Sequence, residues 1–474
     1  MPQRRAHVAP SAAQSELAAA LAALRDDLEV PVEFTAAAEA EASAASPAAP
    51  QLDLRDVPFA TLDPAGAKDL DQAFHLAKEG SGYVVRYAIA DVPAFVTPGG
   101  AVDAAARERG QTLYAANGSI PLHPRVLSED HASLLPDVDR PALVWTFDLT
   151  DDATVSQFRL ERALIRSRAQ LDYATTQQAL DHGEDSPASL LREIGELRIA
   201  KEQQRGGASL NMPDEEVVQH EDGTYSIVRA NPLPLEEWNA QLSLMTGMAA
   251  AELMIKAKIG VLRTMPAPDK RAFDTFRHQT EALGRPWTSG EYGQYLRTLD
   301  REDPLTLPVL EAAASLFRGA GYVSFDGSVP TDIEQAAIAA PYAHTTAPLR
   351  RLVDRWSLTI CLAISEGEEV PGWARESLSQ IPEIMQQSRQ RESQLNTNTI
   401  NRVEAALLTP LVGTRIEATV IELRGEDGDR AQIQIADPAV TASAPIPAGT
   451  KPGDTISVQL VRADIAKGQV EFAL

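Results

Sequence analysis

The chain has 474 residues, more than one ordinary hydrophobic core organises, so we expect two or three domains. Its single cysteine, Cys361, excludes a disulfide framework and a cysteine-based zinc site, and no run approaches 18 uninterrupted apolar residues, so we expect a cytoplasmic protein without a membrane span. The formal net charge of -24 at pH 7 argues against a surface that coats nucleic acid everywhere, but it is compatible with a local basic channel.

The first part of the chain, residues 1–52, is a short segment whose fold the sequence leaves unassigned. Apolar residues recur at helical spacing over residues 15–28, behind a serine that can cap them, which predicts one helix. The Ala-, Glu- and Ser-rich residues 35–50 fit a short helix or a linker equally well. A DNA-binding helix-turn-helix is conceivable, but only one of its helices has a clear pattern.

The middle of the chain mixes strand-like and helix-like patterns without strict alternation, which is typical of an α+β fold. Residues 82–90 are rich in β-branched and aromatic side chains and predict a strand, and residues 144–149 and 155–163 predict a hairpin. Residues 101–110 predict a helix that is followed by a short strand at 111–114.

Helical patterns dominate from about residue 189 to residue 408. Residues 240–262 are nearly all apolar and predict one long buried helix. Residues 349–364 predict a helix that carries Arg350 and Arg351 on its first turns, and residues 373–408 predict one or two more helices.

The last part of the chain, residues 409–474, changes to short β-runs separated by turn residues. This spacing predicts a small OB-fold β-barrel, and the alternative is another small barrel without a role in nucleic-acid binding. The runs lack the aromatic side chains that usually stack on bases. The five runs are residues 413–421, 431–436, 442–446, 454–461 and 469–474.

An acidic loop, residues 61–73, contains three carboxylates within nine positions. Asp69 and Asp71 are two positions apart, so an extended backbone places both carboxylates on one face and turns Leu70 toward the core. Asp63 precedes a Pro-Ala-Gly sequence that is typical of a turn. Converging carboxylates repel one another unless a hard cation such as Mg²⁺ neutralises them. The loop is therefore a candidate Mg²⁺ site for phosphoryl transfer, and the alternative is an acidic turn that faces water.

Four separated blocks of sequence carry further information. They are, in chain order, TLDPAGAKDLDQAFHL at 61–76, YAIADVPAFVTPGGAVDAAARERGQTLY at 87–114, IPLHPRVLSEDHASLLPDVDRPAL at 120–143 and PYAHTTAPLRRLVDRW at 341–356. Together they resemble the catalytic domain of the ribonuclease II / ribonuclease R family of 3'-to-5' exoribonucleases. The resemblance covers roughly residues 53–400 and implies an RNB-type catalytic domain, residues 53–408, in which a mixed sheet combines with helices. It also implies a C-terminal OB-fold RNA-binding domain, residues 409–474.

The resemblance assigns metal binding to residues of the acidic loop. Asp63, Asp69 and Asp71 match the family's metal-binding aspartates, and Asp71 has the position most directly tied to catalysis. The family usually has a fourth aspartate where this chain has Gln72, which loses one negative charge but keeps a carbonyl oxygen as a possible ligand. Ala347 replaces a serine that is common in the last block, so one possible hydrogen bond is lost.

The resemblance assigns RNA contacts to three other residues. Arg350 matches the catalytic arginine that grips the phosphate beside the scissile bond, where a guanidinium can bind two oxygens. Tyr114 matches the aromatic residue that stacks on a base near the 3' end, and we expect Arg351 to contact the RNA as well. The alternatives are an ion pair between Arg350 and Asp354, one helical turn on, and a core position for Tyr114.

The function implied by the resemblance is hydrolytic, processive removal of nucleotides from single-stranded RNA 3' ends by a monomer that uses one or two Mg²⁺ ions. The products are nucleoside 5'-monophosphates and a short end product. Relatives carry two cold-shock OB-folds before the catalytic domain, whereas about 50 residues precede it here, so substrate capture should rest on the N-terminal segment, the barrel and the channel. Two alternatives remain open, a catalytically silent RNA-binding protein on the same fold and an unrelated Mg²⁺ phosphatase or nucleotidyl enzyme.

Overall fold

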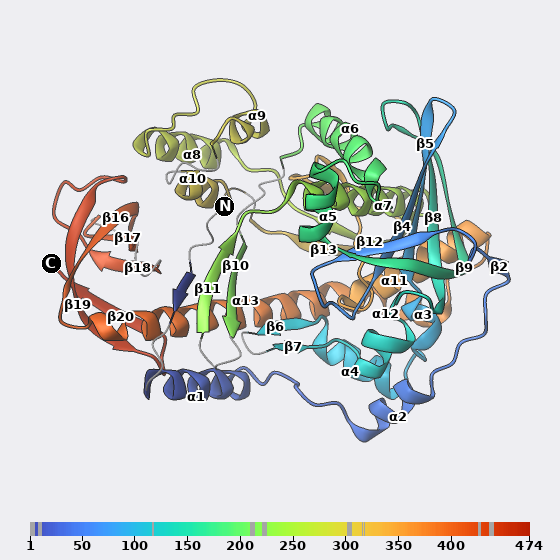
Figure 1. Ribbon diagram of the computed structural model, residues 1–474, viewed down its shortest axis with the longest axis horizontal. Coiled ribbons are helices and arrows are strands. Elements are labelled where there is room, and N and C mark those ends of the chain that lie inside the picture. Colours follow the sequence, from blue (N-terminus) through green and yellow to red (C-terminus); the bar gives the residue numbers. More distant parts are fainter. Residues whose placement is uncertain are drawn as a thin grey trace.

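The computed structural model describes residues 5–7, 12–115, 118–208, 214–219, 225–300, 306–314, 316, 318–424, 428–435 and 440–474. The molecule is elongated, with a small β-barrel at one end and a large sheet at the other (Figure 1). The helix α13 (Ile381–Leu408) runs between these two ends. Within the described ranges no helix is long and apolar enough to span a bilayer.

The large sheet has six strands in the order β2-β9-β3-β4-β5-β8. The first part of β9 pairs antiparallel with β8, and its second part pairs parallel with β3, so the sheet closes on itself. The predicted strand at 82–90 is β5, and β8 and β9 form the predicted hairpin, so both predictions are confirmed. The bounds are β2 (Leu52–Asp53), β3 (Phe59–Asp63), β4 (Gln72–Glu79), β5 (Gly82–Ala90), β8 (Asp139–Leu149) and β9 (Val155–Asp172).

Helices cover both faces of this sheet. Its pairings are antiparallel except those of β9 with β2 and β3, and this mixed sheet with helices confirms the α+β fold class. One core lies between the sheet and the helices α6 (Ser189–Arg205), α7 (Pro234–Ala257) and α11 (Leu352–Glu366). A second core lies on the other face, against α2 (Ala36–Ala44), α3 (Val92–Phe95) and α4 (Ala101–Arg109). The remaining elements of this part are β6 (Leu113–Ala115), β7 (Gly118–Ile120), the π-helix η1 (Leu127–His131), α5 (Tyr173–Asp181), β10 (Asp214–Gln219), β11 (Tyr225–Ala230), β14 (Glu334–Gln335), β15 (Ala340–Pro341), α12 (Gly372–Ser377) and η2 (Leu378–Gln380).

Two predicted helix boundaries were wrong. The helix predicted to reach residue 262 ends at Ala257, because Lys258 adopts a left-handed conformation and the chain continues as the strand β12 (Ile259–Thr264) against β13 (Gly321–Asp326). The predicted helix at 349–364 begins only at Leu352, since Arg351 has an extended backbone. Arg350 and Arg351 therefore precede α11.

The C-terminal domain is a five-stranded sheet in the order β18-β17-β16-β19-β20. Its outermost strands β18 and β20 also lie against each other, so the sheet closes into a nearly complete barrel, as the OB-fold prediction requires. The short helix η3 (Thr409–Leu411) leads from α13 into this barrel. Its strands are β16 (Arg415–Arg424), β17 (Arg430–Ile435), β18 (Val440–Pro445), β19 (Thr455–Asp464) and β20 (Gln469–Ala473).

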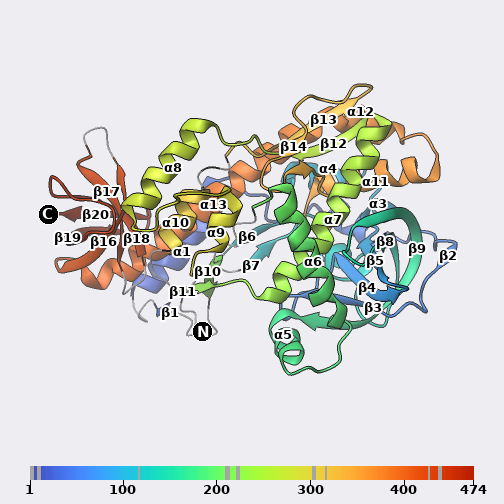
Figure 2. The same ribbon diagram turned by 90° about the horizontal axis from the view of Figure 1, so that it is seen from above.

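Two smaller groups of helices border α13. Residues of α1 (Ala12–Asp27), the predicted N-terminal helix, share a buried core with the end of α13 and the barrel. Residues 36–44 form α2, so helix was the right choice over linker for that part of residues 35–50. On another side of α13, α8 (Lys270–Ala282), α9 (Tyr292–Arg297) and α10 (Thr306–Ala314) lie between the barrel and the large sheet (Figure 2). The strand β1 (Arg5–His7) pairs with β11.

Candidate active site

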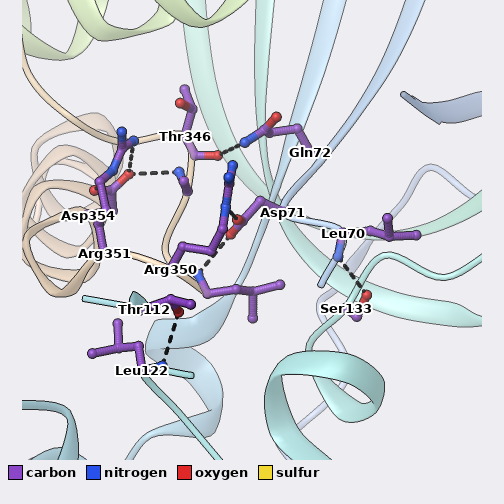
Figure 3. Close-up of polar contacts among 12 residues, drawn as sticks. Leu70, Asp71, Gln72, Thr112, Leu122, Ser133, Thr346, Arg350, Arg351 and Asp354 are labelled. Carbon is purple, nitrogen blue, oxygen red and sulfur yellow. Dashed lines mark hydrogen bonds and ion pairs between the residues drawn. The ribbon is translucent and has the colours of Figure 1, made fainter. Parts of the chain in front are cut away.

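The acidic loop connects β3 to β4, and its backbone is held by the serine of a neighbouring segment. Asp63 is the last residue of β3, and Gln72 is the first residue of β4. Ser133 Oγ donates to the Lys68 carbonyl oxygen (2.6 Å) and accepts from the Leu70 N–H (3.0 Å; Figure 3). The Leu70 side chain is fully buried, as predicted from the spacing of its two acidic neighbours.

Asp71 is joined to the segment that precedes α11, although 279 positions separate it from Arg350 in the sequence. One carboxylate oxygen accepts the Leu349 N–H (2.7 Å), and the other accepts Arg350 Nε (2.8 Å; Figure 3). Asp354 pairs instead with Arg351, through Nε (2.9 Å) and Nη2 (2.8 Å). The alternative ion pair between Arg350 and Asp354 was therefore wrong.

Burial makes the three carboxylates of the loop difficult to ionise. Burial raises the pKa of Asp71 to about 7, although Arg350 and the Leu349 N–H act in the opposite direction. Burial, together with the charge of Asp69, raises the pKa of Asp63 to about 6 against the effect of Arg350. Burial raises the pKa of Asp69 as well. A bound cation would offset this cost of ionisation.

The loop offers oxygen atoms that fit a hard cation. Asp63 Oδ2 is buried and has no hydrogen-bond partner within the described ranges. The Gln72 amide nitrogen donates to the Thr346 carbonyl oxygen, which leaves the Gln72 carbonyl oxygen as its potential ligand. In the described part of the chain, no group of three or more His, Cys, Asp or Glu side chains is arranged to hold a metal ion. The assignment of Asp63, Asp69, Asp71 and Gln72 as metal ligands stays a prediction.

Tyr114 belongs to a hairpin that is formed by β6 and β7, and it lies beside Arg350. The Thr112 N–H donates to the Arg350 carbonyl oxygen (2.9 Å), and Gln111 forms a β-bridge with Arg351. Tyr114 is 51% exposed, so its alternative placement in the core was wrong. Burial lowers the pKa of the Arg350 guanidinium, but Asp71 and Tyr114 outweigh that effect and raise it.

A cavity of about 320 Å³ adjoins this hairpin and contains side chains that the sequence analysis missed. The predicted residues Tyr114, Arg350 and Arg351 line it together. For Arg263, the one signal in the sequence was an arginine near the end of an otherwise apolar run. His344 lies within the family block at residues 341–356, whose other residues carried the prediction. The lining residues missed by the prediction are Gln111, Thr112, Arg263, Tyr322, His344, Met385, Arg389 and Glu392.

Comparisons with known protein families agree with this architecture. The RNB domain matches residues 51–360, which is more than half of the chain. The chain belongs to the RNB family. The RNase II-type exonuclease C-terminal S1 domain matches residues 414–474, within the barrel. The resemblance inferred from the four sequence blocks is confirmed.

Curated relatives of this chain include a plant and a bacterial protein. The exosome complex exonuclease RRP44 homolog A of Arabidopsis thaliana is 29% identical in an alignment of 321 residues that covers 64% of this chain and 34% of that protein. Ribonuclease R of Escherichia coli is 28% identical in an alignment of 324 residues that covers 64% of this chain and 39% of that protein. The chain thus spans less than half the length of these relatives.

Solved structures share the fold at low sequence identity. The apo form of Mycoplasma genitalium RNase R aligns with a TM-score of 0.85 at 18% identity, covering 97% of this chain and 78% of that chain. Yeast Ssd1, described as a pseudonuclease, aligns with a TM-score of 0.67 at 15% identity, covering 83% of this chain and 50% of that chain. The RNB fold therefore occurs both in nucleases and in a pseudonuclease.

Proposed function

We propose that this RNB-family protein is a Mg²⁺-dependent 3'-to-5' exoribonuclease. It hydrolyses single-stranded RNA processively to nucleoside 5'-monophosphates and a short end product, and it acts as a cytoplasmic monomer. The observation that carries this proposal is the junction of Asp71 with Arg350, beside a cavity that Tyr114 also lines. A carboxylate suited to metal binding, a guanidinium suited to phosphate binding and an aromatic ring suited to base stacking thus come from three distant parts of the sequence.

The chain's own residues have distinct roles in this proposal. Asp63, Asp69 and Asp71, with the carbonyl oxygen of Gln72, would hold one or two ions. Bound Mg²⁺ supplies an activated water and stabilises the departing oxygen. Arg350 releases part of its contact with Asp71 as it takes the negative charge of the scissile phosphate.

Two further residues orient the substrate. The exposed Tyr114 ring offers a stacking surface for a base next to Arg350. Arg351 lines the same cavity, and its paired carboxylate, Asp354, also accepts the Ala347 N–H (2.7 Å). Asp354 therefore fixes both the arginine and the backbone that leads to Arg350.

A catalytically silent RNA-binding protein is the second candidate. Two observations favour it. Both Asp71 oxygens are already engaged by protein groups, and Gln72 stands where the family usually has an aspartate. The same fold also occurs in a pseudonuclease, so it is compatible with this candidate. Such a protein would bind RNA through the cavity and the barrel without cleaving it.

The two candidates are separated by comparing Asp71→Asn with a matched control, Asp152→Asn. Asp152 is exposed and pairs with Lys201 away from the site. With single-stranded RNA and Mg²⁺, the wild type and Asp152→Asn should release mononucleotides, and Asp71→Asn should release none while it still binds the RNA in EDTA. Binding by all three proteins with no mononucleotide release from any of them would establish the silent alternative.

A further inference from the structure

The cavity beside Arg350 contains an excess of positive charge. Four arginines line it, and Glu392 is the one acidic side chain among its lining residues. Arg350 faces Asp71, and Arg351 faces Asp354. For Arg263 and Arg389 there is no ion pair with an acidic residue in the described part of the chain. In the described part of the chain, two guanidinium groups therefore lack an ion-paired carboxylate, and they line a cavity that two further guanidinium groups also line.

Backbone pairing and an aromatic ring, rather than an ion pair, position Arg263 at the cavity. The backbone N–H of Arg263 donates to the Tyr342 carbonyl oxygen (2.8 Å), and Arg263 lies opposite Tyr322 in the pairing of β12 with β13. The guanidinium lies 4.7 Å from the centre of the Tyr322 ring. Tyr322 is fixed in turn by a hydrogen bond between its hydroxyl and His344 Nδ1 (2.7 Å). A stacked guanidinium keeps its donors free for an anion.

Arg389 approaches the same space from α13. Its Nη1 donates to the Ala320 carbonyl oxygen (2.6 Å), just before β13 begins. Burial lowers the pKa of Arg263, and the charges of Arg389 and Arg351 lower it further. These like charges repel one another in the protein without a ligand, and an anion between them would relieve that repulsion.

We propose that Arg263 and Arg389 form a second phosphate subsite, which binds a phosphodiester group of the RNA strand other than the scissile one. This inference rests on the proposed function, in which Arg350 binds the scissile phosphate. A strand that places one phosphate at Arg350 carries the next phosphates through the same cavity. Guanidinium groups bind phosphate oxygens through paired hydrogen bonds, which suits them to this task. A free phosphate or a released nucleoside 5'-monophosphate has the same chemistry, so the test separates these sources.

The test measures RNA binding in EDTA, so that it does not depend on catalysis. Single-stranded oligonucleotides carry one uncharged methylphosphonate linkage, moved one position at a time from the 3' end, and affinity is read by fluorescence anisotropy. In the wild type, neutralising one linkage other than the scissile one should weaken binding about tenfold, the effect of one charged contact. In Arg263→Gln, neutralising the same linkage should weaken RNA binding little, because the arginine that contacts this linkage is already absent.

Three further variants make the test specific. Arg389→Gln, on an exposed position of α13, should reduce the same coupling, and it serves if Arg263→Gln fails to fold. Arg263→Lys keeps the charge but loses the planar fork, so it should keep part of the coupling. Arg375→Gln removes an exposed arginine that pairs with Asp326 outside the cavity, and it should behave like the wild type.

The possible results divide clearly. Equal linkage effects in the wild type and in Arg263→Gln would overturn the subsite. A different pattern would identify a site for a free anion and would also overturn the subsite. In that pattern, the wild type binds nucleoside 5'-monophosphate in the absence of RNA, Arg263→Gln does not, and no methylphosphonate linkage changes RNA affinity. Linkage coupling in a protein that releases no mononucleotides with Mg²⁺ would support the subsite and refute the proposed exonuclease. Absence of RNA binding by the wild type would refute both.

Discussion

The hydroxyl of Ser133 holds the acidic loop in place, so the change Ser133→Ala should damage both stability and activity. The residue is fully buried, and its Oγ bonds to the Lys68 carbonyl oxygen and to the Leu70 N–H. Alanine fits the same space but makes neither bond. The loop that it would loosen carries Asp69 and Asp71.

The magnitude follows from the two bonds separately. The Leu70 N–H is buried and would lose its partner, which costs about 1–3 kcal/mol. The Lys68 carbonyl oxygen belongs to an exposed residue and can turn to water, so it adds little. The Leu134 N–H still donates to the Leu70 carbonyl oxygen (3.0 Å), so the loop should shift rather than unfold. A shift of about 1 Å in a catalytic group costs on the order of 100-fold in rate.

Ser128→Ala is a matched control, since Ser128 is also buried but its hydroxyl makes only a marginal contact with the Pro124 carbonyl oxygen (3.5 Å). Urea unfolding should place Ser133→Ala about 1–3 kcal/mol below the wild type and Ser128→Ala within about 1 kcal/mol of it. Mononucleotide release should fall strongly in Ser133→Ala alone. Equal stability and equal rates in the two variants would refute the role of this hydroxyl.

Three other predictions test separate parts of the structure. Arg355→Met should lower the free energy of unfolding by about 1–3 kcal/mol, because the buried Asp103 loses its 2.6 Å contact with Arg355 Nη1 but keeps Arg107 and the Gly99 N–H as partners; an unchanged free energy in urea unfolding would contradict this. Cys361 should not react with a thiol reagent in the folded protein, because complete burial raises the pKa of its thiol. The thiol should react once urea unfolds the chain. Rapid labelling of the native protein would be inconsistent with the core described. Gln72→Asp should lower the Mg²⁺ concentration needed for half-maximal activity about tenfold, since a carboxylate is the better ligand. The same change should destabilise the protein in EDTA, because the Thr346 carbonyl oxygen loses its donor. An unchanged Mg²⁺ dependence would show that residue 72 is not a ligand.

Local sequence patterns were enough to predict the elements whose pattern is undisturbed. The strand at 82–90 is rich in β-branched and aromatic residues, and its observed bounds are the predicted ones. The five β-runs of the barrel were predicted from their turn residues in the same way. The end of helix α7 was predicted five residues too late, because the apolar residues 259–262 continue its composition while the backbone turns at Lys258.

The partners within the site were beyond local patterns. Arg350 has a carboxylate four positions further along the chain, yet its partner is Asp71, because Arg350 precedes α11 and lacks the helical spacing to Asp354 that the prediction assumed. Arg263 is half-buried in a strand whose sequence resembles a core segment, and its pairing with Tyr322 brings it to the cavity. Such contacts depend on tertiary structure, and the resemblance to the RNB family supplied Asp71 and Arg350 but not Arg263.

The central claim is that hydrolysis begins at the RNA 3' end and releases one nucleoside 5'-monophosphate at a time. The most direct measurement uses single-stranded RNA with a radiolabelled phosphate in the last phosphodiester linkage, with Mg²⁺ and the intact chain. The account predicts that the label appears first and entirely as nucleoside 5'-monophosphate, before the body of the RNA shortens further, and that none is released in EDTA. Release of the label in an oligonucleotide, or its retention while 5'-terminal fragments appear, would contradict the account.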